Sequence, residues 1–224
     1  ATVAEQEWSR AAPDGVIVVC SRMYIEEVNL TGLEGLLQQV DRAAKEVASA
    51  RCNVIIQCGT PAVFIKGYGY DRVLIERLQD LTGVPCTTMM TSVVEALRTL
   101  NVNKVAVGTA YIDELNSLLK QFLTESGFEV VHIEGLGLLK NVDIGDQPPG
   151  TAYRLGRKVM QHAPDADALF ISCAGLRTFE VIDALEKDLG VPVVTSSQAA
   201  FWNGLRMAGV HDSIQGVGKL LAHF

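Results

Sequence analysis

Two segments far apart in the chain share one pattern, a short apolar run that leads to a cysteine followed by small residues. The first segment, 54–58, ends at Cys58, and the second, 168–172, is followed by Cys173. Such runs are typical of buried parallel strands that end in a tight turn. In open α/β sheets, ligands bind beyond the carboxyl ends of the strands. Both thiols are therefore expected where a substrate binds, although a lone cysteine is more often a small buried residue.

Short apolar runs alternate with amphipathic stretches along most of the chain. This alternation predicts parallel sheets covered on both faces by helices, an α/β fold with right-handed crossovers. The predicted strands are 15–20, 53–58, 84–88, 104–108, 128–133, 168–172 and 191–195. The predicted helices are 33–50, 71–82, 92–100, 113–126, 151–162, 179–189 and 199–208. The Gly/Pro-rich segment 135–150 is expected to be an active-site loop or lid.

The chain contains an internal repeat. Gly-Val-Pro at 83–85 recurs at 190–192, and Ala-Leu-Arg at 96–98 corresponds to Gly-Leu-Arg at 204–206. Each copy begins with one of the two cysteine-bearing strand ends. Coincidence is the alternative, but four shared features in the same order make a true repeat the better interpretation. Two such units related by pseudo-symmetry would place both cysteine loops at one cleft.

Composition excludes several classes of function. The net charge of −7 argues against nucleic acid and against an anionic membrane surface as partners. No apolar stretch reaches the roughly 18–20 residues of a transmembrane helix, and no leader is evident, so a cytoplasmic location is expected. Neither a GxGxxG sequence after a strand nor a Walker loop is present, which argues against a nucleotide cofactor.

The cysteines and histidines suggest no metal centre. Five cysteines without a paired framework fit reduced thiols rather than disulfides. The sequence has no CxxC motif and no Cys/His cluster, so no metal site is predicted. The four histidines are scattered and are expected to be structural or at the surface.

Thiols at strand ends, beside glycine and near helix N-termini, are expected to lose their protons easily. One thiol can protonate a planar carbanion, whereas two on opposite sides can move a proton between faces or add to a double bond. Thr60, Tyr111, Ser196, Ser197 and the backbone N–H groups after the two cysteines are candidates to hold a substrate oxygen. Alternatively, the Ser and Thr residues are helix caps and the tyrosine lies at the surface.

Several segments together resemble a known family. Residues 172–178, 189–197, 201–202 and 205–209 are similar to the aspartate/glutamate racemase superfamily, in the branch of arylmalonate decarboxylases and maleate cis-trans isomerases. Residues 86–89 and 109–113 resemble the decarboxylases as well. The resemblance extends from about residue 20 onward.

The resemblance implies two flavodoxin-like lobes, each a parallel sheet flanked by helices, in pseudo-twofold relation and without a cofactor. The first lobe would be residues 1–100, with 199–224 packing back on it, and the second 101–198. The strand and loop that open the family have no counterpart before Thr2, so a shortened chain is expected.

The first cysteine distinguishes the branches. Decarboxylases carry Gly-Thr-Ser in the first loop and one catalytic cysteine, whereas isomerases and racemases carry a second cysteine there. Aligned without gaps, Gly59 and Thr60 match the decarboxylases, and Cys58 falls one position early, on the strand. Aligned through the internal repeat, Cys58 matches Cys173 and becomes the second thiol. We favour the gapless alignment, although Pro61 in place of serine removes a hydroxyl from the site.

The resemblance thus implies a carbon-acid enzyme that acts on a small di-acid, most closely an arylmalonate decarboxylase. Cys173 would protonate an enediolate held by Thr60, Tyr111 and the N–H groups near Gly59 and Ala174. In the first alternative, Cys58 and Cys173 together catalyse cis-trans isomerisation or racemisation. In the second, the chain binds a di-acid without turnover. A homodimer is expected by default.

Overall fold

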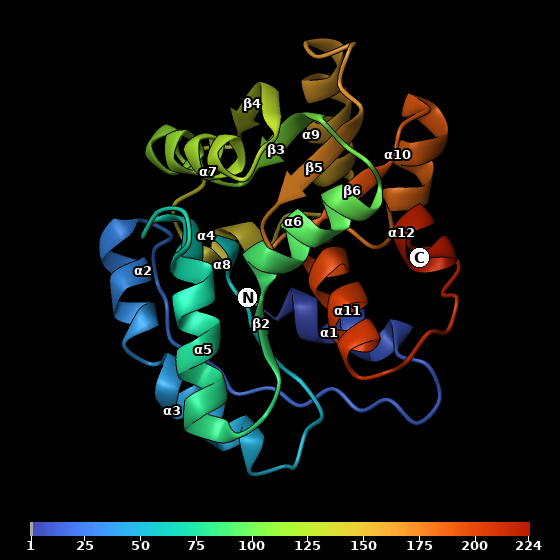
Figure 1. Ribbon diagram of the computed structural model, residues 1–224. Coiled ribbons are helices and arrows are strands. Elements are labelled where there is room, and N and C mark those ends of the chain that lie inside the picture. Colours follow the sequence, from blue (N-terminus) through green and yellow to red (C-terminus); the bar gives the residue numbers. More distant parts are fainter. Residues whose placement is uncertain (1) are drawn as a thin grey trace.

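Two parallel sheets organise residues 2–224, the part of the chain that the computed structural model describes (Figure 1). Residue 1, which the predicted first lobe includes, lies outside this part. The smaller sheet pairs β1 (Ile55–Gln57) with β2 (Cys86–Thr88). The larger has the order β4 (Glu129–Gly135), β3 (Lys104–Thr109), β5 (Ala168–Ser172) and β6 (Val193–Thr195). The alternating pattern is therefore confirmed as an α/β fold with parallel sheets.

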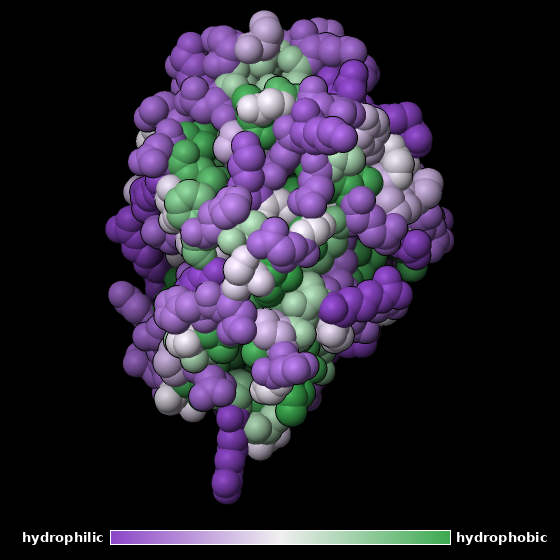
Figure 2. All heavy atoms as spheres, turned by 90° about the vertical axis from the view of Figure 1, so that its right-hand side faces the viewer, coloured by the Kyte–Doolittle hydropathy of each residue, from purple (hydrophilic) through white to green (hydrophobic). Residues whose placement is uncertain are grey.

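Helices flank both sheets. They are α1 (Val3–Ala11), α2 (Leu30–Leu37), α3 (Val40–Ala48), α4 (Thr60–Phe64), α5 (Tyr70–Thr82), α6 (Met89–Thr99), α7 (Asp113–Glu125), α8 (Asn141–Gly145), α9 (Pro149–Gln161), α10 (Ile182–Leu189), α11 (Ser196–Met207) and α12 (Lys219–His223). In Figure 1 the larger sheet occupies the upper half, and β2 with α2, α3 and α5 the lower half. One apolar cluster runs through both halves. On the face shown in Figure 2, hydrophilic side chains are interspersed with hydrophobic ones.

Burial explains the central strand of the larger sheet. Every residue of β5 is buried, as its uninterrupted apolar sequence predicts for a strand covered on both faces. Helix α9 packs closely on β5 because Gly156 has no side chain: an added Cβ would lie 2.7 Å from a methyl carbon of Leu169. The sheet therefore holds the end of β5, and Cys173 after it, in one position.

The sequence repeat corresponds to a structural repeat. Helix α6 follows β2 directly, and Thr88 caps it by accepting a hydrogen bond from the N–H of Thr91 at 3.0 Å. Helix α11 follows β6 in the same way, where Thr195 and Gln198 form a capping box. The two helices pack against each other. Both caps precede the predicted helix starts, since Ser and Thr at strand ends satisfy the first free N–H groups.

The predicted strand 15–20 is wrong. This segment is extended but joins no sheet, and Ile17 is 84% exposed. Side chains bind the backbone that follows it: the amide of Gln39 exchanges two hydrogen bonds with the backbone of Tyr24, each 2.9 Å long. A strand needs a neighbouring strand for its ladder, and none of the residues 2–224 provides one here.

One helix prediction needs correction, and one predicted loop contains a short helix. The helix predicted at 33–50 is divided into α2 and α3 at Gln38 and Gln39, where the Gln39 amide donates to the carbonyls of Gly35 and Tyr24. The segment 135–150, expected to be an active-site loop or lid, contains α8 and is held by backbone hydrogen bonds on both sides, and its role at the site stays a prediction. Its residues Leu136 and Leu138 donate to the carbonyls of Thr109 and Ala110, while other backbone bonds join 139–141 to 26–28.

Candidate active site

Four strand ends meet around the second cysteine. Cys58 follows β1, Tyr111 lies two residues beyond β3, Cys173 follows β5, and Ser196 follows β6. Because the strands within each sheet are parallel, their carboxyl ends lie at the same edge, which is where α/β proteins bind ligands. Hydrogen bonds then show which of these side chains share one site.

Cys173 occupies a strained turn. Its φ of 149° lies in a region that only glycine adopts freely. Such strain costs about 1–3 kcal/mol and is concentrated at functional sites. The N–H of Gly175 donates to the sulfur across 3.4 Å, and Tyr111 is a further hydrogen-bond partner of the thiol. The residue is half-buried, and its sulfur is held by these two donors.

Burial raises the pKa of the Cys173 thiol, an effect that the hydrogen bonds from Gly175 and Tyr111 oppose. The prediction that this thiol loses its proton easily is therefore wrong. Desolvation destabilises a thiolate more than the nearby donors stabilise it. At neutral pH the group is a protonated thiol, which is the form that a proton donor requires.

Tyr111 connects the two sheets through its hydroxyl. Ser172 donates a hydrogen bond of 3.3 Å to this oxygen, and Cys173 and Thr60 are also hydrogen-bond partners of the phenol. The tyrosine is fully buried, which excludes the surface alternative. Its ring packs against Phe64 with centroids 6.0 Å apart. Burial raises the pKa of Tyr111 well above its usual value, so the phenol stays protonated.

Thr60 and Ser196 complete the cluster. The Thr60 hydroxyl donates to the Ser196 hydroxyl at 2.9 Å, and both residues are fully buried. Thr60 begins α4 and Ser196 begins α11, so the bond joins elements of the two repeated units. Together Thr60, Tyr111, Ser172, Cys173 and Ser196 form a buried group of neutral hydroxyl and thiol donors. We call this group the hydroxyl cluster.

A second layer of polar residues positions Tyr111. Thr109 donates to the side-chain oxygen of Asn116 at 2.5 Å and accepts from the N–H of Tyr111 at 3.1 Å. Asn116 donates to the Tyr111 carbonyl at 3.5 Å. Gly135 packs against this corner, where an added Cβ would lie only 2.2 Å from the Tyr111 carbonyl oxygen. Neither Thr109 nor Asn116 was predicted as a site residue, although Asn116 is a polar residue on an otherwise apolar, buried helix face.

Cys58 stands apart from the hydroxyl cluster. Its sulfur donates to the carbonyl of Ile56 at 3.7 Å. Burial raises the pKa of this thiol to about 12, with a smaller contribution from Cys20. A one-residue shift along a strand turns a side chain to the opposite face. The gapless alignment likewise excludes Cys58 from the site, and the choice between the two alignments stays a prediction.

The other predicted binding residues differ in their surroundings. The Ser197 hydroxyl accepts a hydrogen bond of 3.1 Å from the indole N–H of Trp8, so it already has a partner on α1. Gly59 has a φ of 113° at the start of α4, and Pro61 is buried within it. Ala174 follows the strained cysteine. Gln57 is also buried, and its side-chain oxygen has no hydrogen-bond partner among residues 2–224.

Two aromatic residues at and after α4 lie in different surroundings. Phe64 contacts Tyr111, as described above. Tyr68, in contrast, is 46% exposed and packs against Phe122, with the guanidinium of Arg72 over its ring. Tyr68 therefore faces the surface beside α7, where the aromatic contact fixes it.

Comparisons with known proteins agree with this arrangement. The family model described as arylmalonate decarboxylase matches residues 12–221. Arylmalonate decarboxylase from Bordetella bronchiseptica is 34% identical over 201 residues, which cover 90% of this chain and 83% of that protein. A liganded, doubly substituted arylmalonate decarboxylase has a TM-score of 0.89 at 32% identity, covering 92% and 88% of the two chains. The maleate isomerase from Pseudomonas putida S16 has a TM-score of 0.94 at 25% identity, covering 99% and 94%.

The parallel sheets flanked by helices define an α/β fold that matches solved arylmalonate decarboxylase structures. The chain belongs to the arylmalonate decarboxylase and maleate isomerase family, within the aspartate/glutamate racemase superfamily. Its relatives are decarboxylases and isomerases. Within residues 2–224, no helix is both long and apolar enough to cross a bilayer.

Proposed function

We propose that the protein is a cofactor-independent decarboxylase of a small di-acid of the arylmalonate kind, with Cys173 as its proton donor. The observation that carries the proposal is the placement of one protonated thiol in the hydroxyl cluster, beside Tyr111 and the N–H of Gly175. The Cys58 thiol instead donates a hydrogen bond to the Ile56 carbonyl, and we assign it no part in the cluster. The greater identity to the decarboxylase than to the maleate isomerases supports the same choice.

The hydroxyl cluster provides the donors that the reaction needs. Thr60, Tyr111 and the N–H groups near Gly59 and Ala174 would hold the carboxylate that is retained. When the other carboxylate leaves as CO₂, the electron pair of the broken C–C bond moves into the retained carboxylate and forms an enediolate. Neutral donors that are already in place stabilise this charge without reorganisation. Ser196 keeps the Thr60 hydroxyl in position.

Cys173 would then transfer its S–H proton to the α-carbon, which gives a monoacid and a thiolate. The N–H of Gly175 and the Tyr111 hydroxyl can stabilise that thiolate until solvent returns a proton. A raised pKa suits this step, because the thiol arrives protonated and is a stronger acid than the carbon acid that it forms.

The proposal includes the division into two flavodoxin-like lobes related by a pseudo-twofold axis. Residues 1–100 with 199–224 form one lobe and 101–198 the other. The equivalent junctions of β2 with α6 and of β6 with α11 support it, as do the contacts between α6 and α11. A homodimer and a cytoplasmic location complete this account as predictions from the sequence.

A substrate panel tests the proposal. The purified protein is incubated with phenylmalonate, maleate and amino or hydroxy di-acids, and CO₂, fumarate and optical rotation are followed. We expect CO₂ and phenylacetate from phenylmalonate. Fumarate or racemised di-acid without CO₂ would replace the proposal with the two-thiol alternative that uses Cys58. Binding of a di-acid by calorimetry, without any product, would replace it with the binding-protein alternative.

A further inference from the structure

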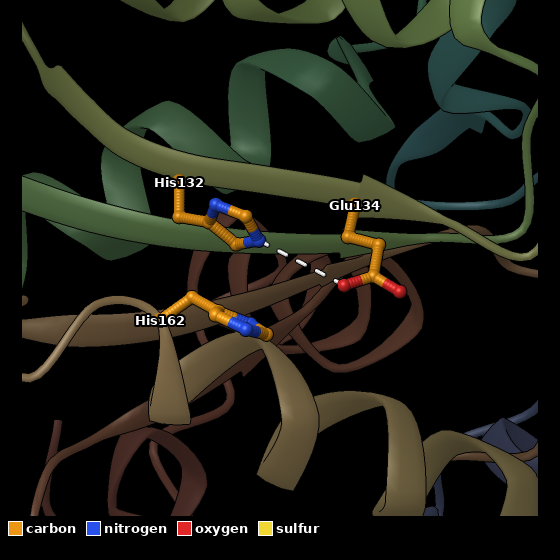
Figure 3. Close-up of side chains that lie close together, drawn as sticks. All are labelled: His132, Glu134 and His162. Atoms are coloured by element: carbon orange, nitrogen blue, oxygen red, sulfur yellow. Dashed lines mark ion pairs between the residues drawn. The ribbon is translucent and has the colours of Figure 1, made fainter.

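We propose that His132, Glu134 and His162 form a binding site for a divalent transition-metal ion at the edge of the larger sheet. One ligand atom from each side chain lies within 4.8 Å of the others (Figure 3). The three side chains come from β4 and the end of α9, not from the strand ends that carry the hydroxyl cluster. The site is therefore additional to the proposed active site.

The backbone brings these three residues together. His132 and Glu134 are two positions apart on β4, so both side chains project from the same face of the strand. The pairing of β3 with β4 shifts register between Val105 and Ala106, which places Ala106 opposite His132. Helix α9 packs on β4, and His162 is its C-cap residue. The two histidine rings are tilted by 39° to each other, with centroids 5.1 Å apart.

The hydrogen bonds of the two histidines leave the Nε2 atom of each ring available to bind a metal. Nε2 of His132 is buried and has no hydrogen-bond partner within residues 2–224, since the Glu134 oxygen with which it is paired lies 3.8 Å away. A buried polar atom without a hydrogen bond is costly, and a bound cation would satisfy it. Nδ1 of His162 lies 3.1 Å from the carbonyl of Lys158. An N–H given to a backbone carbonyl is the arrangement that orients metal-binding histidines and leaves Nε2 as the ligand.

The donor set indicates the kind of metal. Two imidazoles with one carboxylate suit Zn²⁺, Ni²⁺ or Cu²⁺ rather than Mg²⁺ or Ca²⁺, which prefer oxygen ligands alone. Tetrahedral zinc with bonds of about 2.0–2.1 Å holds its ligand atoms roughly 3.4 Å apart. The 3.8 Å pair is close to that spacing. Rotation of the exposed His162 side chain closes the remainder, and water takes the fourth position.

Lys158 competes with the metal for Glu134. Its ammonium is paired with the second carboxylate oxygen, and its side chain is 60% exposed. A dication would repel this ammonium, which is free to swing into solvent. Removal of the Lys158 charge should therefore strengthen metal binding. If the Lys158–Glu134 pair had only a structural role, its loss would leave metal affinity unchanged.

Calorimetric titration of the chelator-treated protein with ZnCl₂, and separately with NiCl₂, tests the proposal. We expect one site per chain, with a Kd at least about tenfold weaker in His132→Gln and in His162→Gln. Lys158→Gln should bind more tightly than the parent. His211→Gln, which alters a histidine outside the cluster, should bind like the parent. Thermal unfolding should show a rise in Tm with metal in the parent, in His211→Gln and in Lys158→Gln, but little or none in His132→Gln and His162→Gln.

Cobalt distinguishes this site from the cysteines. Co²⁺ bound by imidazole and carboxylate gives weak visible bands, while thiolate ligands add intense near-ultraviolet charge-transfer absorption. His162→Gln changes an exposed side chain, so this variant should fold and can be tested even if His132→Gln does not fold. Unchanged affinity in His162→Gln, no binding by the parent, or a thiolate band that accounts for all the bound cobalt would each overturn the proposal.

Discussion

The hydroxyls of Thr60 and Ser196 lie 2.9 Å apart although the two residues are 136 positions apart in the chain. Each residue begins a helix, α4 or α11, at the end of a parallel strand. Because both side chains are fully buried, this bond is made within the core. The two repeated units are thereby joined at the hydroxyl cluster.

Loss of this bond should reduce stability in a coupled way. In Thr60→Val the Ser196 hydroxyl loses its buried donor, which costs about 1–3 kcal/mol of unfolding free energy. In the double variant Thr60→Val/Ser196→Ala neither member of this pair is left without its partner, so the loss should be less than the sum of the single losses. Urea unfolding of the four proteins of the cycle measures this. Additive losses would contradict the contact.

Tyr111→Phe should mainly reduce turnover. The variant keeps the ring that packs on Phe64 but loses the hydroxyl that contacts Ser172 and Cys173. Removal of one donor from an oxyanion site typically lowers kcat by about 10²–10³-fold. Steady-state kinetics with phenylmalonate measure the change, and circular dichroism checks the fold. A kcat within a factor of two of the parent would exclude Tyr111 from the site.

Gly135→Ala should displace the Tyr111 corner. The added methyl would lie 2.2 Å from the Tyr111 carbonyl and 2.5 Å from the Asn116 amide, so the backbone must move. We expect a loss of about 1–3 kcal/mol from overpacking, together with lower kcat. Gly35→Ala is the matched control, because an added Cβ there meets nothing within 4 Å and Gly35 lies in α2. That control should be neutral or slightly stabilising.

The pH profile should reflect a protonated Cys173. Burial holds its pKa above the ordinary thiol range, so the active acid form is complete at neutral pH. Activity should be constant up to about pH 8.5, the usual thiol pKa, and fall only as pH rises through the raised value. The free energy of unfolding should change with pH in the same direction. The pKa values of Cys58 and Cys173 are raised in the folded state, so their contribution to stability is complete below the ordinary thiol pKa and is lost as pH rises through the raised values. An activity that increases from pH 7 to 9 would indicate a thiolate mechanism instead.

Local sequence signals predicted much of the architecture and part of the site. Uninterrupted apolar runs identified β3 and β5 because these strands are covered on both faces. The strand ends then indicated Thr60, Tyr111 and Cys173, since parallel strands carry their ligand sites at one edge. These three residues do lie together in the hydroxyl cluster.

Other features depend on tertiary contacts that short windows do not contain. The extended segment 15–20 has the composition of a strand, but no strand lies beside it in the described chain. The position of Gly135 near Tyr111 follows from the pairing of β3 with β4, which sets Gly135 opposite Thr109. The grouping of His132 with His162 has the same origin, because spacing along the chain does not relate an edge strand to the end of a helix. The raised pKa of Cys173 reflects burial, which outweighs the nearby N–H donors that the sequence suggested.

Replacement of each cysteine separately tests the central claim most directly. Phenylmalonate decarboxylation is measured for the parent, Cys58→Ser and Cys173→Ser under identical conditions. A single-thiol mechanism predicts that Cys58→Ser keeps activity close to that of the parent, while Cys173→Ser loses at least about 10²-fold, the lower end of general acid catalysis. Complete loss of activity in a folded Cys58→Ser protein, or full activity in Cys173→Ser, would contradict it.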